Sequence, residues 1–561
     1  MLLLTAAILV TSLGFLETSA SDDGELSVNE FPYQEVLNED YTLYWNFNST
    51  HIIFKSVVKT KGFVGFGISP DGGMVYSDIA IGWVNDGRAY FIDTFTEGHY
   101  ISSMVAKKDW QVLSGTEVGD VTTLIFLRKL FPCEPKNLPI SEGTTRVIYS
   151  YGPNDPSANN SINYHGYNRG SKSILLLNPP METPLPDDVT TVEFLNKDFA
   201  LPGEDTHYRC RMFKVPDLGQ KHHVIRVEPV IQPGSEEVVH HMVLYACHNG
   251  FDDQYVGTSF RCYTETPEAL TNCEKHVFAG WAVGAEGYSY PDVVGHSLGA
   301  PGDPVYFKLQ IHYSNPSLRT DVVDNSGLRL FLTKKLRRFD AGMAEAGVFV
   351  DRYLAIPPYE QSFLASGYCT PECINQNLGD QEIKVIGVLL HSHLLARKMR
   401  TRHIRNGVEL APILEDNTYD FNYQQTRILK REIAVKKGDF LVTECDYDSR
   451  QRTRVTYGGL NTTLEMCMSY LLYYPKTTLT SCYTSTKYKF DDHTNVGNFV
   501  DAMNKKDWTN PDVRRQFKKD VQEAEILDYC GVDTESTIFP TTSAPKPEIK
   551  VPYKQPNLCD N

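Results

Sequence analysis

Histidine and methionine side chains in three short clusters are the groups in this sequence best suited to metal chemistry. Imidazole nitrogens bind zinc, copper, iron or nickel, whereas a thioether is a soft ligand that suits Cu(I) and is a poor choice for zinc. The clusters therefore predict two metal sites of different chemistry, with copper at the one that includes methionine. They are His240-His241 with His312, His391-Ser392-His393, and Met466 within Glu465-Met466-Cys467.

The pair His391 and His393 lies in a largely apolar stretch, residues 383–395, that indicates a buried strand. Residues two apart in a strand point to the same face, so both rings can bind one ion while Ser392 points away. A lone histidine in such a strand is more often a hydrogen-bonded core residue. The paired spacing and the soft methionine elsewhere favour the metal interpretation.

His240 and His241 head another predicted strand, residues 242–247. Adjacent strand residues point to opposite faces, so both can bind one ion only at a strand end or a bulge. His312 alternates with apolar neighbours in residues 307–313, and its ring is free to face a partner. The similar doublet His222-His223 is interpreted as structural.

Length and composition indicate a large globular protein that is rich in β structure. A chain of 561 residues predicts several domains, and 32 tyrosines with 27 phenylalanines favour strands. The net charge of -16 without a basic stripe argues against nucleic acid as a partner.

The N-terminus, residues 1–20, is an apolar run that ends in small residues and resembles a secretory signal cleaved near Ala20. Because the positive region that normally precedes such a run is missing, an uncleaved anchor in the endoplasmic reticulum membrane is the alternative. No other stretch reaches the ~18 apolar residues that a membrane span requires. The sequence therefore predicts a secreted protein, or one in the lumen of the secretory pathway, without a transmembrane partner.

Cysteines and glycosylation motifs agree with that compartment. Twelve cysteines predict six disulfides in an oxidising environment, with a thiolate metal site at Cys369 and Cys373 as the competing idea. The motif Asn-x-Ser/Thr predicts glycosylation at Asn48, Asn159 and Asn461.

Short β-favouring runs separated by turns indicate a β-sandwich at residues 36–155. Its stretch 62–69, followed by Ser77-Asp78-Ile79, resembles the DOMON domain. Some members bind haem, but Met74 and His99 are interpreted here as surface loop residues. A proline-rich linker is expected at 178–189, then two β-rich domains at 190–335 and 338–500, and a tail at 501–561 with one amphipathic helix near residues 513–527.

Four separated motifs together resemble the copper type II, ascorbate-dependent monooxygenases, and most of all the dopamine β-hydroxylase-like branch that carries a DOMON domain in front. The likeness runs from about residue 40 to 485. The motifs are His240-His241-Met242-Val243-Leu244, Leu309-Gln310-Ile311-His312-Tyr313, Leu390-His391-Ser392-His393-Leu394, and residues 457–460 through Glu465-Met466-Cys467 to Tyr473-Tyr474-Pro475.

The resemblance implies an all-β fold in which two jelly-roll sandwiches follow the DOMON sandwich and face each other across a solvent-filled cleft. It implies two copper ions, with ascorbate as reductant and O2 as oxidant. His240, His241 and His312 would hold the electron-supplying copper, and His391, His393 and Met466 the copper at which oxygen is activated. It further implies the disulfides Cys210–Cys262, Cys247–Cys273, Cys369–Cys482, Cys445–Cys467, Cys373–Cys530 and Cys133–Cys559.

Two residues, Leu389 and Tyr470, bear on the class of substrate. Where the peptide-amidating branch has an arginine for the substrate carboxylate, this chain has Leu389, which argues against peptides. Tyr470 is a candidate pocket residue beside the catalytic Met466. A small phenylethylamine-like substrate, hydroxylated at an aliphatic or benzylic carbon, is therefore expected.

Two alternatives to this interpretation bear on activity, and the cysteine spacing bears on assembly. A catalytically silent secreted protein of the same fold, binding copper or another ligand, is the main rival. A zinc hydrolase is disfavoured because the sequence has no His-Glu-x-x-His motif. Closely spaced cysteines that would link subunits are missing between Cys482 and Cys530, so any homo-oligomer is expected to be non-covalent.

Overall fold

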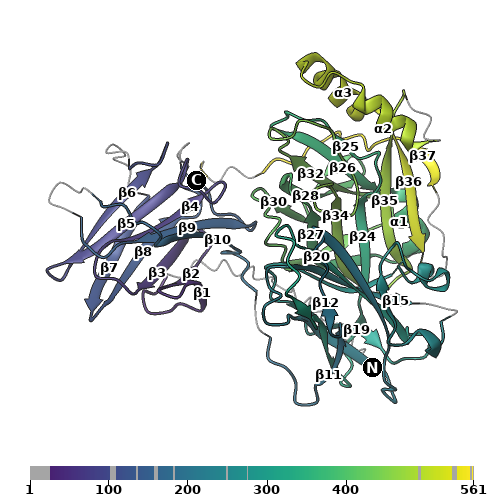
Figure 1. Cartoon of the computed structure of the whole chain (residues 1–561), viewed down its shortest axis with the longest axis horizontal. Helices are drawn as coiled ribbons and strands as arrows, with labels where there is room; N and C mark the ends of the chain where they lie inside the picture. Colours follow the sequence, from purple (N-terminus) through teal and green to yellow (C-terminus); the bar gives the residue numbers. More distant parts are fainter. Residues whose placement is uncertain are drawn as a thin grey trace, which may run out of the picture. The chain divides into compact units, whose positions relative to one another are not determined.

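The computed structural model describes residues 26–101, 109–133, 137–156, 162–180, 183–247, 251–274, 276–490, 495–532, 540–555 and 559. The chain divides into two compact units, one of residues 1–140, 147–172 and 558–561, and the other of residues 141–146 and 173–557 (Figure 1). The expected signal at residues 1–20 and the sequon at Asn159 lie outside the described residues. Helices within the described ranges are all too short or too polar to cross a membrane.

The first unit is the expected β-sandwich, made of two five-stranded sheets. Phe54, Phe66 and Phe126 pack between the sheets against Trp110. Met74 differs from its expected surface position, because it is partly buried against Phe63 and other apolar residues. The sheets have the orders β1(Tyr33–Asn38)-β2(Tyr41–Phe47)-β3(His51–Val58)-β8(Val121–Lys129)-β7(Trp110–Val118) and β10(Arg169–Ile174)-β9(Thr145–Tyr151)-β4(Val64–Ser69)-β5(Asp78–Asn85)-β6(Arg88–Phe95).

The second unit begins with a sandwich of a six-stranded and a five-stranded sheet, which share one apolar core. The first sheet has the order β11(Thr190–Leu195)-β22(Gly327–Thr333)-β14(His222–Val230)-β19(Val294–Leu298)-β23(Phe339–Asp340), with β18(Tyr288–Ser289) beside β14. The other has the order β16(Ser259–Arg261)-β13(Thr206–Lys214)-β20(Tyr306–Ser314)-β15(Val239–Cys247)-β17(Val277–Ala282). Smaller elements are β12(Phe199–Ala200) paired with β21(Val323–Asp324), and the 3-10 helices η1(Asp253–Tyr255) and η2(Glu268–Glu274).

A second sandwich in the same unit pairs a seven-stranded with a five-stranded sheet around its own core. The larger sheet has the order β31(Arg427–Val435)-β27(Ile383–Ser392)-β34(Cys467–Tyr474)-β24(Gly342–Val348)-β35(Leu479–Lys487)-β36(Glu525–Val532)-β37(Pro540–Ala544). The smaller has the order β26(Phe363–Cys369)-β32(Asp439–Tyr447)-β28(Ala396–Arg405)-β29(Val408–Glu409), with β30(Leu414–Asp416) beside β28. The remaining elements are β25(Ala355–Ile356), β33(Thr456–Tyr457), α1(Pro371–Leu378), α2(Val496–Asn504) and α3(Pro511–Glu523).

The C-terminal part differs from the expected tail with one helix. The boundary at residue 500 falls inside α2, and the helix expected near 513–527 is α3, which ends at Glu523. Residues after it form β36, which pairs with β35. The physical reason is alternation: Ile526, Asp528 and Cys530 are buried, a period-two pattern that suits a strand.

All twelve cysteines form disulfides, in the six pairs that the family resemblance implied. Cys369 bonds to Cys482 and Cys373 bonds to Cys530. A thiolate metal site at Cys369 and Cys373 is therefore excluded, because a sulfur in a disulfide carries no thiolate charge for a metal.

Candidate metal centres

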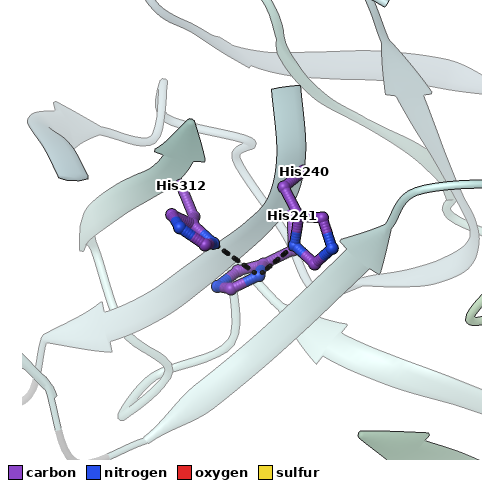
Figure 2. Close-up of side chains that lie close together, drawn as sticks. All are labelled: His240, His241 and His312. Atoms are coloured by element: carbon purple, nitrogen blue, oxygen red, sulfur yellow. Dashed lines mark hydrogen bonds between the residues drawn. The ribbon is translucent and has the colours of Figure 1, made fainter. Parts of the chain in front are cut away.

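Three imidazoles converge where β15 begins. His241 pairs with His312 on the neighbouring β20, and the register shifts between Val239 and His241. This irregularity lets His240 and His241 turn toward the same point although they are adjacent, as the sequence required. His241 Nδ1 lies 3.1 Å from His240 Nδ1 and 3.3 Å from His312 Nδ1 (Figure 2).

The electrostatics of this three-histidine site suit a cation. All three side chains are buried, and burial lowers the pKa of His240 to about 3 and holds the pKa values of His241 and His312 well below the usual imidazole range. The rings are therefore neutral, the state in which histidine binds metals. One ligand nitrogen of each ring lies within 4.8 Å of the other two, a spacing that fits a single metal ion.

Tyr208 supports the three-histidine site from β13. Its ring stacks on His312 with centroids 4.2 Å apart and an angle of 3° between the planes. Its hydroxyl donates a hydrogen bond of 2.6 Å to the carbonyl of Leu460, in the second sandwich. Sequence reasoning missed this residue, because a tyrosine in a β-rich chain gives no signal of its own.

His391 and His393 meet at the end of β27, with ring centroids 5.3 Å apart. His391 Nδ1 lies 2.7 Å from Gln424 Oε1, and His393 Nδ1 lies 3.1 Å from the carbonyl of Leu464. Because both partners are acceptors, each Nδ1 carries the proton and each Nε2 keeps its lone pair. Within the described chain, His393 Nε2 is buried without a hydrogen-bond partner, which leaves it available to a metal.

Met466 presents its side chain to the same face of the sheet as His391. In the ladder of β27 and β34, His391 pairs with Met468 and Ser392 pairs with Cys467. Alternation therefore places Met466, Met468 and Tyr470 on the His391 face and Cys467 on the other. Met466 is 8% exposed and packs with Met468. Soft sulfur beside two imidazoles is a donor set that fits Cu(I).

Glu465 links the segment that carries Met466 to the segment that carries His391 and His393. Its carboxylate accepts hydrogen bonds from the backbone N–H groups of His393 at 3.0 Å and Leu395 at 2.6 Å. The hydroxyl of Ser392 lies 3.0 Å from the same carboxylate and 2.6 Å from the carbonyl of Met466. Ser392 thus points away from the rings, as expected. Sequence reasoning missed Glu465, although an acidic residue between Leu464 and Met466 was a usable signal.

The prediction of a solvent-filled cleft between the two sites is wrong for this structure. The rings of His241 and His391 lie 5.4 Å apart, and Phe421 of the second sandwich stacks on His240 at 4.2 Å. The cause is a set of hydrogen bonds across the junction, among them Gln424 N–H to Val283 O at 3.1 Å. A cavity of about 50 Å³ remains there, lined by His241, Trp281, Tyr288, Met343, Leu389, His391 and Tyr470 together with smaller neighbours.

The doublet His222-His223 is structural, as expected. His223 bonds through Nε2 to Asp340 at 2.7 Å and through Nδ1 to the backbone N–H of Arg337 at 2.9 Å. His222 Nδ1 lies 2.9 Å from the carbonyl of Gln220. Because these ring nitrogens are occupied by protein groups, the doublet is not a metal site.

Family models match three stretches of the chain. They are the DOMON domain at residues 37–152, and the N-terminal and C-terminal domains of copper type II ascorbate-dependent monooxygenases at residues 192–320 and 339–495. Together they cover most of the chain and confirm the family resemblance.

Several known proteins are similar to this chain over most of its length. DBH-like monooxygenase protein 1 of Homo sapiens is 39% identical over 562 residues, which cover 94% of this chain and 91% of that protein. The protein of the same name in Gallus gallus is 37% identical, with 95% and 92% covered. Dopamine beta-hydroxylase of Bos taurus is 34% identical, with 85% and 78% covered. The chain therefore belongs to the copper type II ascorbate-dependent monooxygenase family.

Proposed function

We propose that this copper-dependent monooxygenase hydroxylates an aliphatic or benzylic C–H bond of a small aromatic amine, using O2 and two electrons from ascorbate. His240, His241 and His312 hold the electron-supplying copper. His391, His393 and Met466 hold the copper at which oxygen is reduced. The observation that carries this assignment is the sharing of one sheet face by Met466 and His391, with both histidine Nδ1 atoms already bonded to protein acceptors.

The protein prepares the histidines for copper by keeping them neutral and by fixing the orientation of their rings. Copper, when bound, supplies the one-electron chemistry that an inert C–H bond requires. Burial lowers the pKa of each of the five imidazoles, and the rings are therefore neutral. Gln424 and the carbonyl of Leu464 fix the ring orientations, since a partner on the second nitrogen sets the tautomer of a metal ligand.

The substrate class is supported by the lining beside His391. Leu389, Tyr470 and Trp281 give the cavity an apolar and aromatic wall that suits an aryl group. Glu345 on β24 pairs with Tyr470 in the ladder, so its carboxyl lies on that same sheet face. Among the described residues, no hydrogen bond or ion pair involves the Glu345 carboxyl. The Glu345 side chain is only partly exposed, and a carboxyl in such a position suits the ammonium group of an amine.

The test is turnover of a panel of arylethylamines by purified protein with copper and ascorbate. We expect one new hydroxyl, with oxygen derived from O2, for each O2 consumed. A matched panel of arylalkanes that lack the amine separates recognition of the cation from recognition of the ring. Oxygen uptake without hydroxylated product would instead favour a catalytically silent copper-binding protein.

The pH dependence of turnover tests the role of Glu345. Burial raises the pKa of Glu345 to about 8, so below that pH the empty site is protonated and binds a cation poorly. An aliphatic amine stays protonated to about pH 9, so kcat/KM for an amine should rise about tenfold per pH unit toward pH 8. Tyr470, which faces Glu345 from β34, does not titrate in this range because burial raises its pKa well above the usual value. Ser481 faces it from β35.

Glu345→Gln is the control for this pH profile. It should flatten the rise with pH and raise KM for amines more than for neutral arylalkanes. An unchanged profile in Glu345→Gln would contradict the role of this carboxyl without touching the copper assignment.

The compartment and assembly are proposed on separate grounds. Six disulfides support a protein of the secretory pathway. The sequons at Asn48 and Asn461 lie in partly exposed turns, where glycosylation is sterically possible. Non-covalent self-association stays a prediction.

A further inference from the structure

One loop touches both metal centres. We call residues 417–426, which join β30 to β31, the bridging loop. The hydroxyl of Tyr419 donates to the carbonyl of Ser392 at 2.7 Å and accepts the N–H of the same residue at 2.9 Å, between the two ligand histidines. Gln424 accepts from His391, and Phe421 stacks on His240. The position of this loop therefore sets the orientation of ligands on both sides.

The bridging loop is held by residues 141–146, which come from far away in the sequence. Arg146 donates a hydrogen bond of 2.7 Å to the carbonyl of Tyr419 and lies 3.6 Å from the carboxylate of Asp420. Ser173 donates to that carboxylate at 2.6 Å. Thr418 Oγ1 donates to the carbonyl of Thr144. The loop thus has backbone and side-chain partners in a segment that precedes it by about 270 residues.

A buried polar cluster fixes the start and end of the loop. Asp416, at the end of β30, accepts from the hydroxyl of Thr144 at 2.6 Å and from its N–H at 3.2 Å. Arg427, at the start of β31, pairs with Asp416 and donates to Thr144 Oγ1 at 2.9 Å. All three side chains are buried. Because these groups are buried and hydrogen-bonded to one another, the cluster holds both ends of the loop in place.

By sequence, residues 141–146 belong to the DOMON domain, whereas in the structure they belong to the second unit. They lie within the stretch that matches the DOMON domain, residues 37–152, but they fold as part of the compact unit that holds both metal centres. We infer that residues 141–146 are a positioning element of the oxygen-activating site, in which Arg146 acts through Tyr419 and the bridging loop on Ser392 and His391. This inference rests on the proposed roles of His391, His393 and Met466.

Copper binding to the full-length chain tests this inference without relying on turnover. Arg146→Met removes the hydrogen bond to Tyr419 and the charge beside Asp420. We expect the affinity of the His391 and His393 site for Cu(I) to fall about tenfold, as is typical when a group that supports a metal ligand is lost. The three-histidine site should change less. The infrared stretch of carbon monoxide bound to Cu(I) should shift, because it reports the geometry of the ligands around the metal.

Glu142→Gln is the matched control, because Glu142 lies in the same segment and its exposed ion pair, at 3.2 Å, is with Lys430 of β31, outside the bridging loop. It should leave copper affinity and the carbon monoxide stretch unchanged. If Arg146→Met does not fold, Asp420→Asn and Arg146→Lys weaken the same contacts more gently, and Arg146→Lys should restore part of the affinity.

The outcomes separate this inference from the proposed function. If the wild-type chain binds two coppers per molecule and Arg146→Met matches it in affinity and infrared stretch, the positioning role is wrong. If the wild-type chain fails to bind copper at His391 and His393, the proposed function itself is wrong.

Discussion

Met466→Leu is expected to abolish hydroxylation while copper stays bound at the three-histidine site. Leucine has nearly the volume of methionine, and such exchanges in a packed core usually cost less than about 1.5 kcal/mol of stability. The sulfur donor is lost, however, and with it the soft ligand that favours Cu(I). We expect kcat/KM to fall by more than ~100-fold, the upper end of the loss seen when only a supporting group is removed. Turnover and copper content per chain measure the two effects.

Met468→Leu is the matched control for this result. Met468 lies on β34, which begins one residue after Met466, faces the same side of the sheet, packs in the same cluster, and is 2% exposed. It should bind two coppers and turn over at close to the wild-type rate. Equal loss of activity in both variants would mean that packing, and not the sulfur of Met466, is responsible.

Glu465→Ala should show the second largest effect, on stability and on copper binding together. Two backbone N–H groups, those of His393 and Leu395, donate to this carboxylate, whereas the hydroxyl of Ser392 keeps the carbonyl of Met466 as an acceptor when Glu465 is lost. Leaving a buried donor unpaired costs about 1 to 3 kcal/mol, so the free energy of unfolding should fall by at least about 2 kcal/mol. Denaturant titration measures this loss, and equilibrium dialysis measures weaker copper binding at the second site.

Glu432→Gln serves as the comparison for Glu465. Glu432 lies on β31 of the same sheet, where its carboxylate accepts from Lys384 at 3.0 Å in a partly exposed pair. Loss of a surface ion pair costs at most about 1 kcal/mol. If Glu465→Ala were as stable as Glu432→Gln, the Glu465 carboxylate would not be what stabilises the segments that carry His393 and Met466.

Some of this architecture could be predicted because it depends on local periodicity. The spacing of His391 and His393 in an apolar run was enough to place both rings on one strand face, and the adjacency of His240 and His241 required the irregular strand end that β15 shows. Other elements gave too little local signal. β7, with its many polar side chains, is an example, because an edge strand with one exposed face needs few apolar residues.

Long-range features could not be predicted from one sequence. The approach of His241 to His391, at 5.4 Å, depends on how two sandwiches dock, and no periodicity encodes docking. The attachment of Arg146 to Tyr419 joins residues 273 apart. Residues 525–527, the beginning of β36, were predicted to end a helix, because pairing with β35 decides their conformation. The six cysteine pairs came from family likeness, since twelve cysteines alone allow very many pairings.

The bond between Cys133 and Cys559 spans 426 residues and returns the end of the chain to its first unit. The polypeptide from one sulfur to the other is therefore a covalent ring, and both copper-binding sandwiches are segments of that ring. A single protease cut anywhere along it opens the ring without releasing a fragment, as long as the cystine stays oxidised. In a reducing environment the same cut would leave two polypeptides joined by strand pairing and core packing alone, so the redox state of the compartment decides whether nicked enzyme stays covalently connected.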